Sequence, residues 1–105
     1  EAMIGECLPD ATVIAFGHLG DNNVHVSVGG VEWDEASIRN VEQAVYGCLE
    51  PFAGAISAEH GIGLEKRQYL PISRTDAEIE LMRSLKRLLD RNNILNPGKV
   101  VDATE

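Results

Sequence analysis

The stretch TVIAFGHLGDNNVHVSV, residues 12–28, predicts a β-hairpin. Residues 12–18 are rich in β-branched and aromatic side chains, which favour strands. Residues 23–28 alternate valine with polar side chains, which is the period of a strand with one apolar face. The intervening residues, LGDN, include glycine, aspartate and asparagine, which are typical of tight turns. We therefore expect two antiparallel strands joined by residues 19–22.

The position of the turn determines which side chains share a face of the hairpin. With residues 19–22 as the loop, His18 pairs with Asn23 and Phe16 faces His25. His18 and His25 are then diagonal neighbours on one face, with side-chain origins about 7 Å apart. Two imidazoles at this spacing can share a metal ion. A histidine in a strand is more often a surface or core residue, so the spacing alone leaves both interpretations open.

Two helices are predicted to pack with this hairpin, which gives an α+β fold. The first is expected from Asp34, a typical N-cap residue, to about Glu50. The second begins where Thr75 and Glu78 have capping-box spacing and runs to about Arg91. Apolar residues recur at helical spacing in both, and we expect them to face inward: Ile38, Val41, Val45, Cys48, Leu49 and Phe52 in the first, and Ile79, Met82, Leu85, Leu88 and Leu89 in the second.

The remaining segments carry no helical or strand period. AGAISAEHGIGLEKR, residues 53–67, is expected to be a loop because it is rich in small residues and contains three glycines. Asn92 and Asn93 suit a left-handed helix cap. The tail ILNPGKVVDATE, residues 94–105, is expected to run extended, because Pro97 and Gly98 prevent a helix there.

Composition narrows the class of protein. At 105 residues the chain is one domain at most, and 44% hydrophobic with 25% charged residues is ordinary for a globular fold. The net charge of −8 disfavours nucleic acid as a partner. No apolar run reaches the roughly 18 residues of a membrane span, so we expect a soluble intracellular protein without a transmembrane segment. The first residues suggest a fragment of a longer protein.

The two cysteines, Cys7 and Cys48, are far apart in the sequence. They form no CxxC pair, so they indicate neither a zinc ribbon nor a disulfide framework. We expect both to be small apolar residues that contribute to packing.

All three histidines lie in the two glycine-bounded segments: His18 and His25 in the hairpin, and His60 beside Glu59 in the loop. Two imidazoles and a carboxylate form a mixed nitrogen and oxygen site that can hold zinc, manganese or iron and leave positions open for a substrate. The same loop could instead mark no more than a tight turn.

Three motifs of this chain, GHLGDNNVHV, SAEHGIGLEKR and ILNPGKV, resemble in order three motifs of the C-terminal domain of FAD-linked oxidases. This family contains D-lactate dehydrogenases, D-2-hydroxyglutarate dehydrogenase and the FAD-binding subunit of glycolate oxidase. The resemblance covers residues 12–101. It implies that residues 1–105 are the C-terminal portion of a ferredoxin-like substrate domain that covers the flavin, with the FAD-binding N-terminal domain absent.

The resemblance also implies the chemistry. His18, His25 and Glu59 would bind a divalent metal such as zinc or manganese, and His60 would take the substrate hydroxyl proton. Asn96 would contact FAD, which the absent domain mainly binds. A D-2-hydroxy acid would be oxidised to the 2-oxo acid, and the electrons would pass to an acceptor protein or a quinone. We expect the fragment to be inactive alone, to self-associate, and to be cytoplasmic, or mitochondrial in a eukaryote.

The chain departs from the family pattern at three positions. Asn22 replaces a usual glycine, which a positive-φ turn position accepts. Ser27 stands where many members have an asparagine that contacts the substrate in the 2-hydroxyglutarate enzymes, and Ala58 replaces a common glycine. Two other classes remain open: a metal-binding or assembly module without a redox role, and a small metal-dependent hydrolase with Glu59 or His60 as base.

Overall fold

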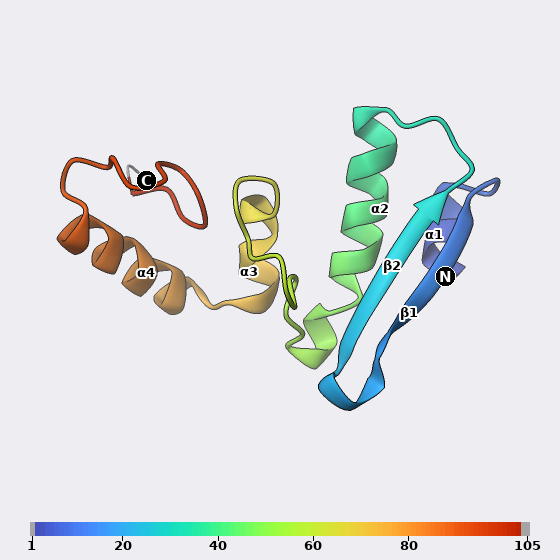
Figure 1. Ribbon diagram of the computed structural model, residues 1–105, viewed down its shortest axis with the longest axis horizontal. Coiled ribbons are helices and arrows are strands. Elements are labelled where there is room, and N and C mark those ends of the chain that lie inside the picture. The colour runs from blue at the N-terminus through green and yellow to red at the C-terminus, as the bar shows by residue number, and fades with distance from the viewer. Residues whose placement is uncertain (1, 104–105) are drawn as a thin grey trace. The chain divides into compact units, whose positions relative to one another are not determined.

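The computed structural model describes residues 2–103, and the chain divides into two compact units, Glu1–Cys48 and Leu49–Glu105. The first unit holds a two-stranded sheet and helices, so the predicted α+β class is confirmed (Figure 1). The elements of the first unit are α1 (Ala2–Cys7), β1 (Thr12–His18), the 3₁₀ turn η1 (Leu19–Asp21), β2 (Asn23–Gly29) and α2 (Glu35–Gly47). Those of the second are η2 (Glu50–Phe52), η3 (Arg67–Tyr69), α3 (Leu70–Ser73) and α4 (Asp76–Leu89).

The β1–β2 hairpin has the predicted register. The strands are antiparallel, with His18 opposite Asn23 and Phe16 opposite His25. The connection is η1 followed by Asn22, whose φ of 53° is left-handed. An asparagine adopts this conformation at low cost, which explains why it can occupy the turn. His18 and His25 therefore lie on one face of the hairpin.

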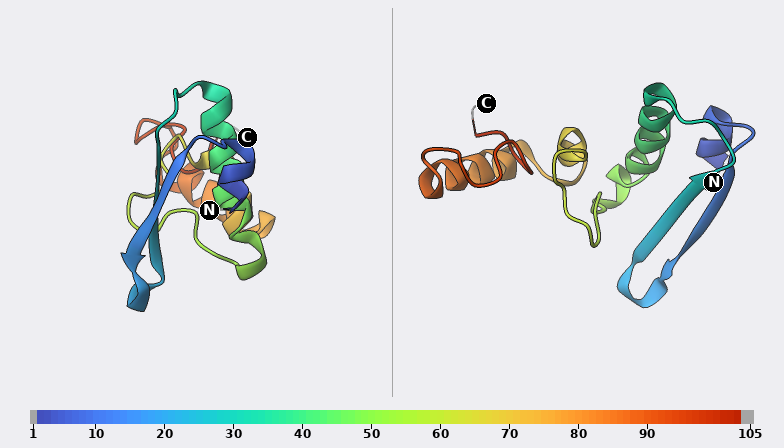
Figure 2. Two further views of the ribbon diagram at one scale, coloured as in Figure 1. Left: turned by 90° about the vertical axis from the view of Figure 1, so that its right-hand side faces the viewer. Right: turned by 45° about the horizontal axis from the view of Figure 1, so that its top comes forward.

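Helices α1 and α2 contact each other and lie on the same side of the hairpin, as the left view of Figure 2 shows. Asp34 caps α2 as predicted: the backbone N–H of Ser37 donates to its carboxylate over 2.7 Å. The helix ends at Gly47 rather than at the predicted Glu50, because residues around the following proline form the separate turn η2. Helix α1 was not predicted.

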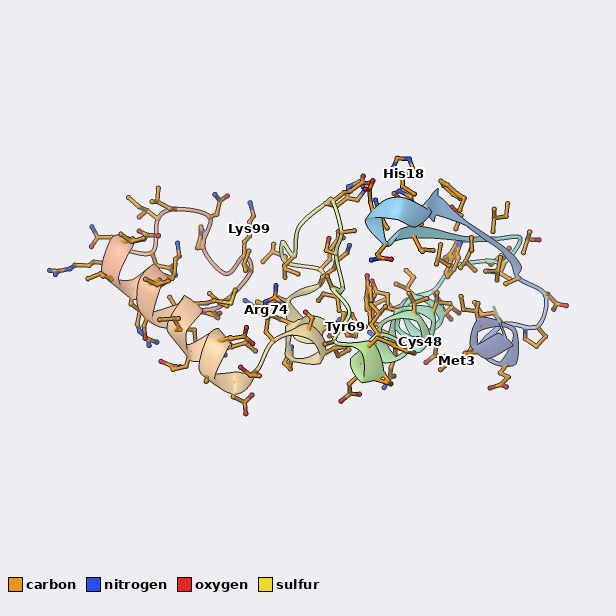
Figure 3. All side chains as sticks on the ribbon, turned by 90° about the horizontal axis from the view of Figure 1, so that it is seen from below. Met3, His18, Cys48, Tyr69, Arg74 and Lys99 are labelled. Atoms are coloured by element: carbon orange, nitrogen blue, oxygen red, sulfur yellow. The ribbon has the colours of Figure 1, made fainter. Side chains whose placement is uncertain are left out.

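The prediction that both cysteines are packing residues is wrong, because Cys7 and Cys48 are exposed. Cys48 nevertheless makes polar contacts: its thiol donates to the carbonyl of Ala44 over 3.0 Å and lies 3.2 Å from the Met3 sulfur. The second contact joins α1 to the end of α2 (Figure 3).

The core of the second unit combines three segments that are distant in the sequence. Leu70, Ile79 and Val101 are buried together, and Ile62, Met82 and Val100 pack against them. The predicted capping box at the start of α4 is present, with Thr75 and Glu78 bonded reciprocally. No helix among residues 2–103 is long and apolar enough to cross a membrane.

The predicted inward face of α4 is only partly correct. Ile79 is buried and Met82 packs against the core, but Leu85 is exposed, and Leu88 and Leu89 are 65% and 78% exposed. The reason is that the core of this unit meets the side of the helix that carries Ile79 and Met82. The last turn of the apolar stripe is left without cover within this unit.

Helix α4 ends at Leu89 rather than Arg91, and the buried Asp90 organises the chain that follows. Its carboxylate accepts hydrogen bonds from the Lys86 ammonium and from the backbone N–H groups of Ile94 (3.0 Å) and Leu95 (2.9 Å). Asn93 is left-handed, as predicted. These bonds turn the chain back on the helix end.

The tail is not extended, contrary to the prediction. Asn96, Gly98 and Val100 all have positive φ, at 49°, 72° and 69°, so the segment is a series of turns. Long-range hydrogen bonds to the Gly63 and Arg67 region hold it in this shape, and no local pattern announces such bonds.

Replacing Asp90 with asparagine is expected to destabilise the fold in a pH-dependent way. The hydrogen bond from Lys86, with those from Leu95 and Ile94, lowers the pKa of Asp90 against the opposing effect of burial. A carboxyl with a lowered folded-state pKa stabilises the fold above its unfolded-state pKa, and this contribution disappears as pH falls through the folded value.

At neutral pH we therefore expect Asp90→Asn to melt several degrees below the unsubstituted chain, with the difference shrinking below about pH 4. Thermal unfolding followed by circular dichroism from acid to neutral pH measures this. Glu65→Gln, at an exposed loop position, is the control and should leave the curve unchanged. A constant difference between Asp90→Asn and the unsubstituted chain at all pH values would contradict the role of the charge.

Candidate functional site

His18 lies at the end of β1, where the hairpin turns. Its side chain is 73% exposed, and its Nδ1 is 3.7 Å from the Asp21 carboxylate one turn of η1 away. Figure 3 shows the ring projecting outward from the hairpin. The carboxylate favours a ring orientation with Nδ1 toward it, and its negative charge also favours a cation nearby.

His25 lies on the same face, one diagonal position along β2, and is partly buried. Its ring stacks on Phe16, with ring centroids 5.2 Å apart and planes 20° from parallel. Stacking restricts rotation of the imidazole, so the partner of Phe16 in the register also determines how the ring is presented. The hairpin thus presents two imidazoles on one face, and one of them is held by an aromatic neighbour.

Glu59 and His60 are both exposed and lie outside helices and strands, as predicted for this loop. The loop is anchored before them by Ile56, which is buried, and by Ser57, whose hydroxyl accepts a hydrogen bond from Lys66 over 3.2 Å. After them, Gly61 and Gly63 have φ of 76° and 58°, a left-handed conformation that favours glycine. Anchors on both sides and glycines after the pair present Glu59 and His60 to solvent.

The second and third sequence motifs meet within the second unit. The backbone N–H of Val100 donates to the carbonyl of Gly63 over 2.8 Å. Arg67 donates to the carbonyl of Gly98 over 2.8 Å and lies 3.3 Å from the Asp102 carboxylate. Sequence reasoning missed Arg67, because one basic residue in a loop gives no signal of a distant carbonyl partner.

A groove of about 590 Å³ runs along this junction. Its walls are mainly apolar, and the ammonium of Lys99 donates to the side-chain oxygen of Asn96 over 3.0 Å at its edge. The residues that line it come from the loop after His60, from α4 and from the tail: Gly61, Ile62, Gly63, Met82, Leu85, Lys86, Leu95, Asn96, Lys99, Val100 and Val101. Asn96, expected from the sequence to contact FAD, therefore lines a groove with the residues that follow His60.

The predicted metal ligands fall in different units. His18 and His25 belong to Glu1–Cys48, and Glu59 with His60 belongs to Leu49–Glu105. Across residues 2–103 no group of three or more His, Cys, Asp or Glu side chains forms a ready metal site. The donor chemistry still fits a divalent cation, because two imidazoles on one face and an exposed carboxylate are a common nitrogen and oxygen ligand set. The three-ligand site stays a prediction.

Replacing Arg67 with alanine is expected to loosen the tail. The substitution removes a charged hydrogen bond to the Gly98 carbonyl and an ion pair in which Arg67 is 36% and Asp102 23% exposed. Because these groups are partly solvated, we expect a loss of about 1 kcal/mol in unfolding free energy. Urea denaturation measures the loss, and hydrogen exchange at the Val100 amide should accelerate.

The control for this prediction is Arg74→Ala. Arg74 is exposed and donates to the carbonyl of the adjacent Ser73, so it holds no distant segment through that bond. Equal effects of the two substitutions on the Val100 amide would show that Arg67 does not hold the tail.

Comparison with known proteins identifies the class. The family model described as FAD linked oxidases, C-terminal domain, matches residues 4–100. The chain is 41% identical over 98% of its length to D-2-hydroxyglutarate dehydrogenase of Stutzerimonas stutzeri (strain A1501), covering 23% of that protein. It is 40% identical over 97% of its length to the enzyme of that name from Xanthomonas citri pv. viticola, again covering 23%.

A putative mitochondrial D-lactate dehydrogenase of Schizosaccharomyces pombe is 38% identical over 89% of this chain, which covers 18% of that protein. The matching relatives are therefore flavin-linked hydroxy-acid dehydrogenases by name. The chain belongs to the family of FAD-linked oxidases, in its C-terminal domain. It spans less than a quarter of the length of the relatives named here.

Proposed function

We propose that these 105 residues are the C-terminal portion of an FAD-dependent dehydrogenase that oxidises a D-2-hydroxy acid to the 2-oxo acid. The substrate is of the D-lactate, D-2-hydroxyglutarate or glycolate type. The observation that carries this proposal is the family match over residues 4–100, together with relatives that bear these names. The FAD-binding domain would lie outside the 105 residues, and this chain would form part of a ferredoxin-like substrate domain.

In this proposal His18, His25 and Glu59 hold a divalent metal such as zinc or manganese. The two histidines share one face of the hairpin, and Glu59 is exposed in an anchored loop, which supports the assignment. A metal bound there would lower the pKa of the substrate hydroxyl and fix the orientation of the substrate.

His60 takes the proton from the substrate hydroxyl. Three features support this role: His60 is exposed, it follows Glu59 directly, and it precedes the groove that ends at Asn96. Histidine is the side chain whose ordinary titration lies nearest neutrality, so it can accept a proton in one step and release it in the next. As the hydroxyl proton moves to His60, the carbon–oxygen bond becomes a carbonyl.

FAD, when bound, accepts the hydride from the carbon that bears the hydroxyl, and the electrons then leave to an acceptor protein or a quinone. The role of this chain is to bind and orient the substrate and to hold one proton. Asn96 contributes to the flavin contact. The Asn96 side-chain oxygen is already engaged by Lys99, so the amide is presented in a defined orientation at the groove.

The proposal extends to location and assembly. Related enzymes of Arabidopsis thaliana and Rattus norvegicus are named as mitochondrial, so we propose a mitochondrial location in a eukaryote and a cytoplasmic one in a bacterium. The net charge of −8 argues against nucleic acid as a partner. The exposed leucines at the end of α4 support self-association of the 105-residue chain.

The test is a dye-reduction assay with two samples. The full-length protein that carries this chain should be yellow and should reduce the dye with a D-2-hydroxy acid. The 105-residue chain mixed with free FAD and D-lactate should not. A colourless full-length protein with tightly held metal would instead favour a metal-binding module, and turnover by the 105-residue chain would contradict the assignment of the flavin to another domain.

A further inference from the structure

We infer that Gly17 is a positioning residue, which sets the spacing of His18 and His25 by allowing the two strands to approach closely at the turn. Gly17 lies in β1 opposite Val24. A Cβ atom added to Gly17 would lie 2.1 Å from the backbone oxygen of Asn23 and 3.0 Å from the Cα of Val24. Both contacts are with backbone, which cannot rotate away as a flexible side chain could.

This requirement is for space rather than for an unusual backbone conformation. Gly17 is absent from the positive-φ residues found among residues 2–103, so alanine could adopt its dihedral angles. The other two glycines of the hairpin differ from it. At Gly20 and Gly29 an added Cβ would meet nothing within 4 Å. Gly17 is therefore the hairpin glycine at which a methyl group would collide with the opposite strand.

The collision would fall between the peptide segments that carry the histidines. Gly17 directly precedes His18, and Val24 directly precedes His25. Asn23, whose carbonyl the methyl would strike, is the cross-strand partner of His18. To accommodate a methyl group, the Asn23–Val24 segment must move away from β1, and His25 moves with it.

Metal binding is sensitive to such a shift. Zinc binds imidazole nitrogen at about 2.0–2.1 Å, so two ligands must converge within tight limits. A displacement on the order of 1 Å is enough to weaken a site built for a fixed geometry. The inference rests on the proposed metal role of the two histidines, and it assigns to Gly17 the spacing that this role needs.

The test compares Gly17→Ala with Gly29→Ala in the 105-residue chain, with Gly20→Ala as a second control. Zinc is titrated into metal-free protein by calorimetry. We expect Gly17→Ala to lower the zinc affinity roughly tenfold to a hundredfold, the range seen when residues that orient ligands are changed. Gly29→Ala and Gly20→Ala should keep the affinity of the unsubstituted chain. Equal affinity in Gly17→Ala would overturn the inference.

Cross-strand NMR contacts separate positioning from loss of the fold. In Gly17→Ala the contact between His18 and Asn23 should weaken, while the Val13–Val28 pair at the other end of the hairpin persists. Loss of both pairs would also overturn the inference, because Gly17 would then maintain the whole hairpin. If the unsubstituted chain binds no zinc, the proposed metal role fails, and the NMR contacts still decide what Gly17 does.

Discussion

Replacing His60 with glutamine in the full-length flavoprotein is expected to lower turnover of the D-2-hydroxy acid by about 10²–10⁴-fold, the usual contribution of a general base. Glutamine keeps a similar length and can still form a hydrogen bond, but it cannot hold the proton. The residue is exposed next to Gly61, so the substitution should not disturb the core. Bound flavin, measured by absorbance, should be unchanged.

The pH profile gives an independent readout of the same substitution. If His60 is the base, the acidic limb of the kcat/KM profile belongs to its imidazole, and that limb should disappear in His60→Gln. Glu65→Gln, at another exposed position of the same segment, is the matched control and should retain both the rate and the profile. Full activity in His60→Gln would remove His60 from the proposed mechanism.

Replacing His18 and His25 together with alanine is expected to lower zinc affinity by at least about a hundredfold, because two of the three proposed ligands are lost. In the full-length protein the same change should remove the metal and abolish turnover while leaving FAD bound, since the flavin is assigned to another domain. Metal analysis, absorbance and the dye assay measure these three quantities on one sample.

Ser27→Ala is the control for this prediction. Ser27 lies on the same strand and the same face as His25 and is also exposed, but it adds no nitrogen ligand. Its zinc affinity should equal that of the unsubstituted chain. Equal loss of affinity in Ser27→Ala would attribute the effect to disturbance of the hairpin, and unchanged zinc affinity in the double variant would exclude both histidines as ligands.

Local sequence features predicted the hairpin and the helix starts correctly. A two-residue period and a turn of glycine, aspartate and asparagine are sufficient to set the register, because neighbouring residues determine both. Asp34 and the Thr75–Glu78 capping box are equally local, since each cap involves residues three positions apart.

The parts that the sequence did not predict depend on distant partners. The shape of the tail is determined by the bond from Arg67 to Gly98 and by that from Val100 to Gly63, which join residues more than thirty positions apart. The exposure of Leu88 and Leu89 has the same origin, because helical periodicity identifies an apolar face but not whether another segment covers it.

The candidate site divides in the same way. Motifs identified His18, His25, Glu59, His60 and Asn96 as chemically suitable residues, and the structure adds how each pair is held: Phe16 against His25, and Ile56 with Lys66 around the loop. The role of Gly17 was hidden, because a glycine in a strand does not reveal which backbone atoms lie opposite it.

The most direct test of the central claim is anaerobic mixing of the full-length protein with a D-2-hydroxy acid while the flavin absorbance is recorded. This half-reaction needs no electron acceptor, so it reports hydride transfer from the substrate alone. We predict that the yellow colour bleaches with the D-enantiomer of lactate or 2-hydroxyglutarate, that the L-enantiomer has no such effect, and that His60→Gln bleaches far more slowly. A flavin that stays oxidised with every D-2-hydroxy acid tested, or a full-length protein without flavin, would contradict the claim.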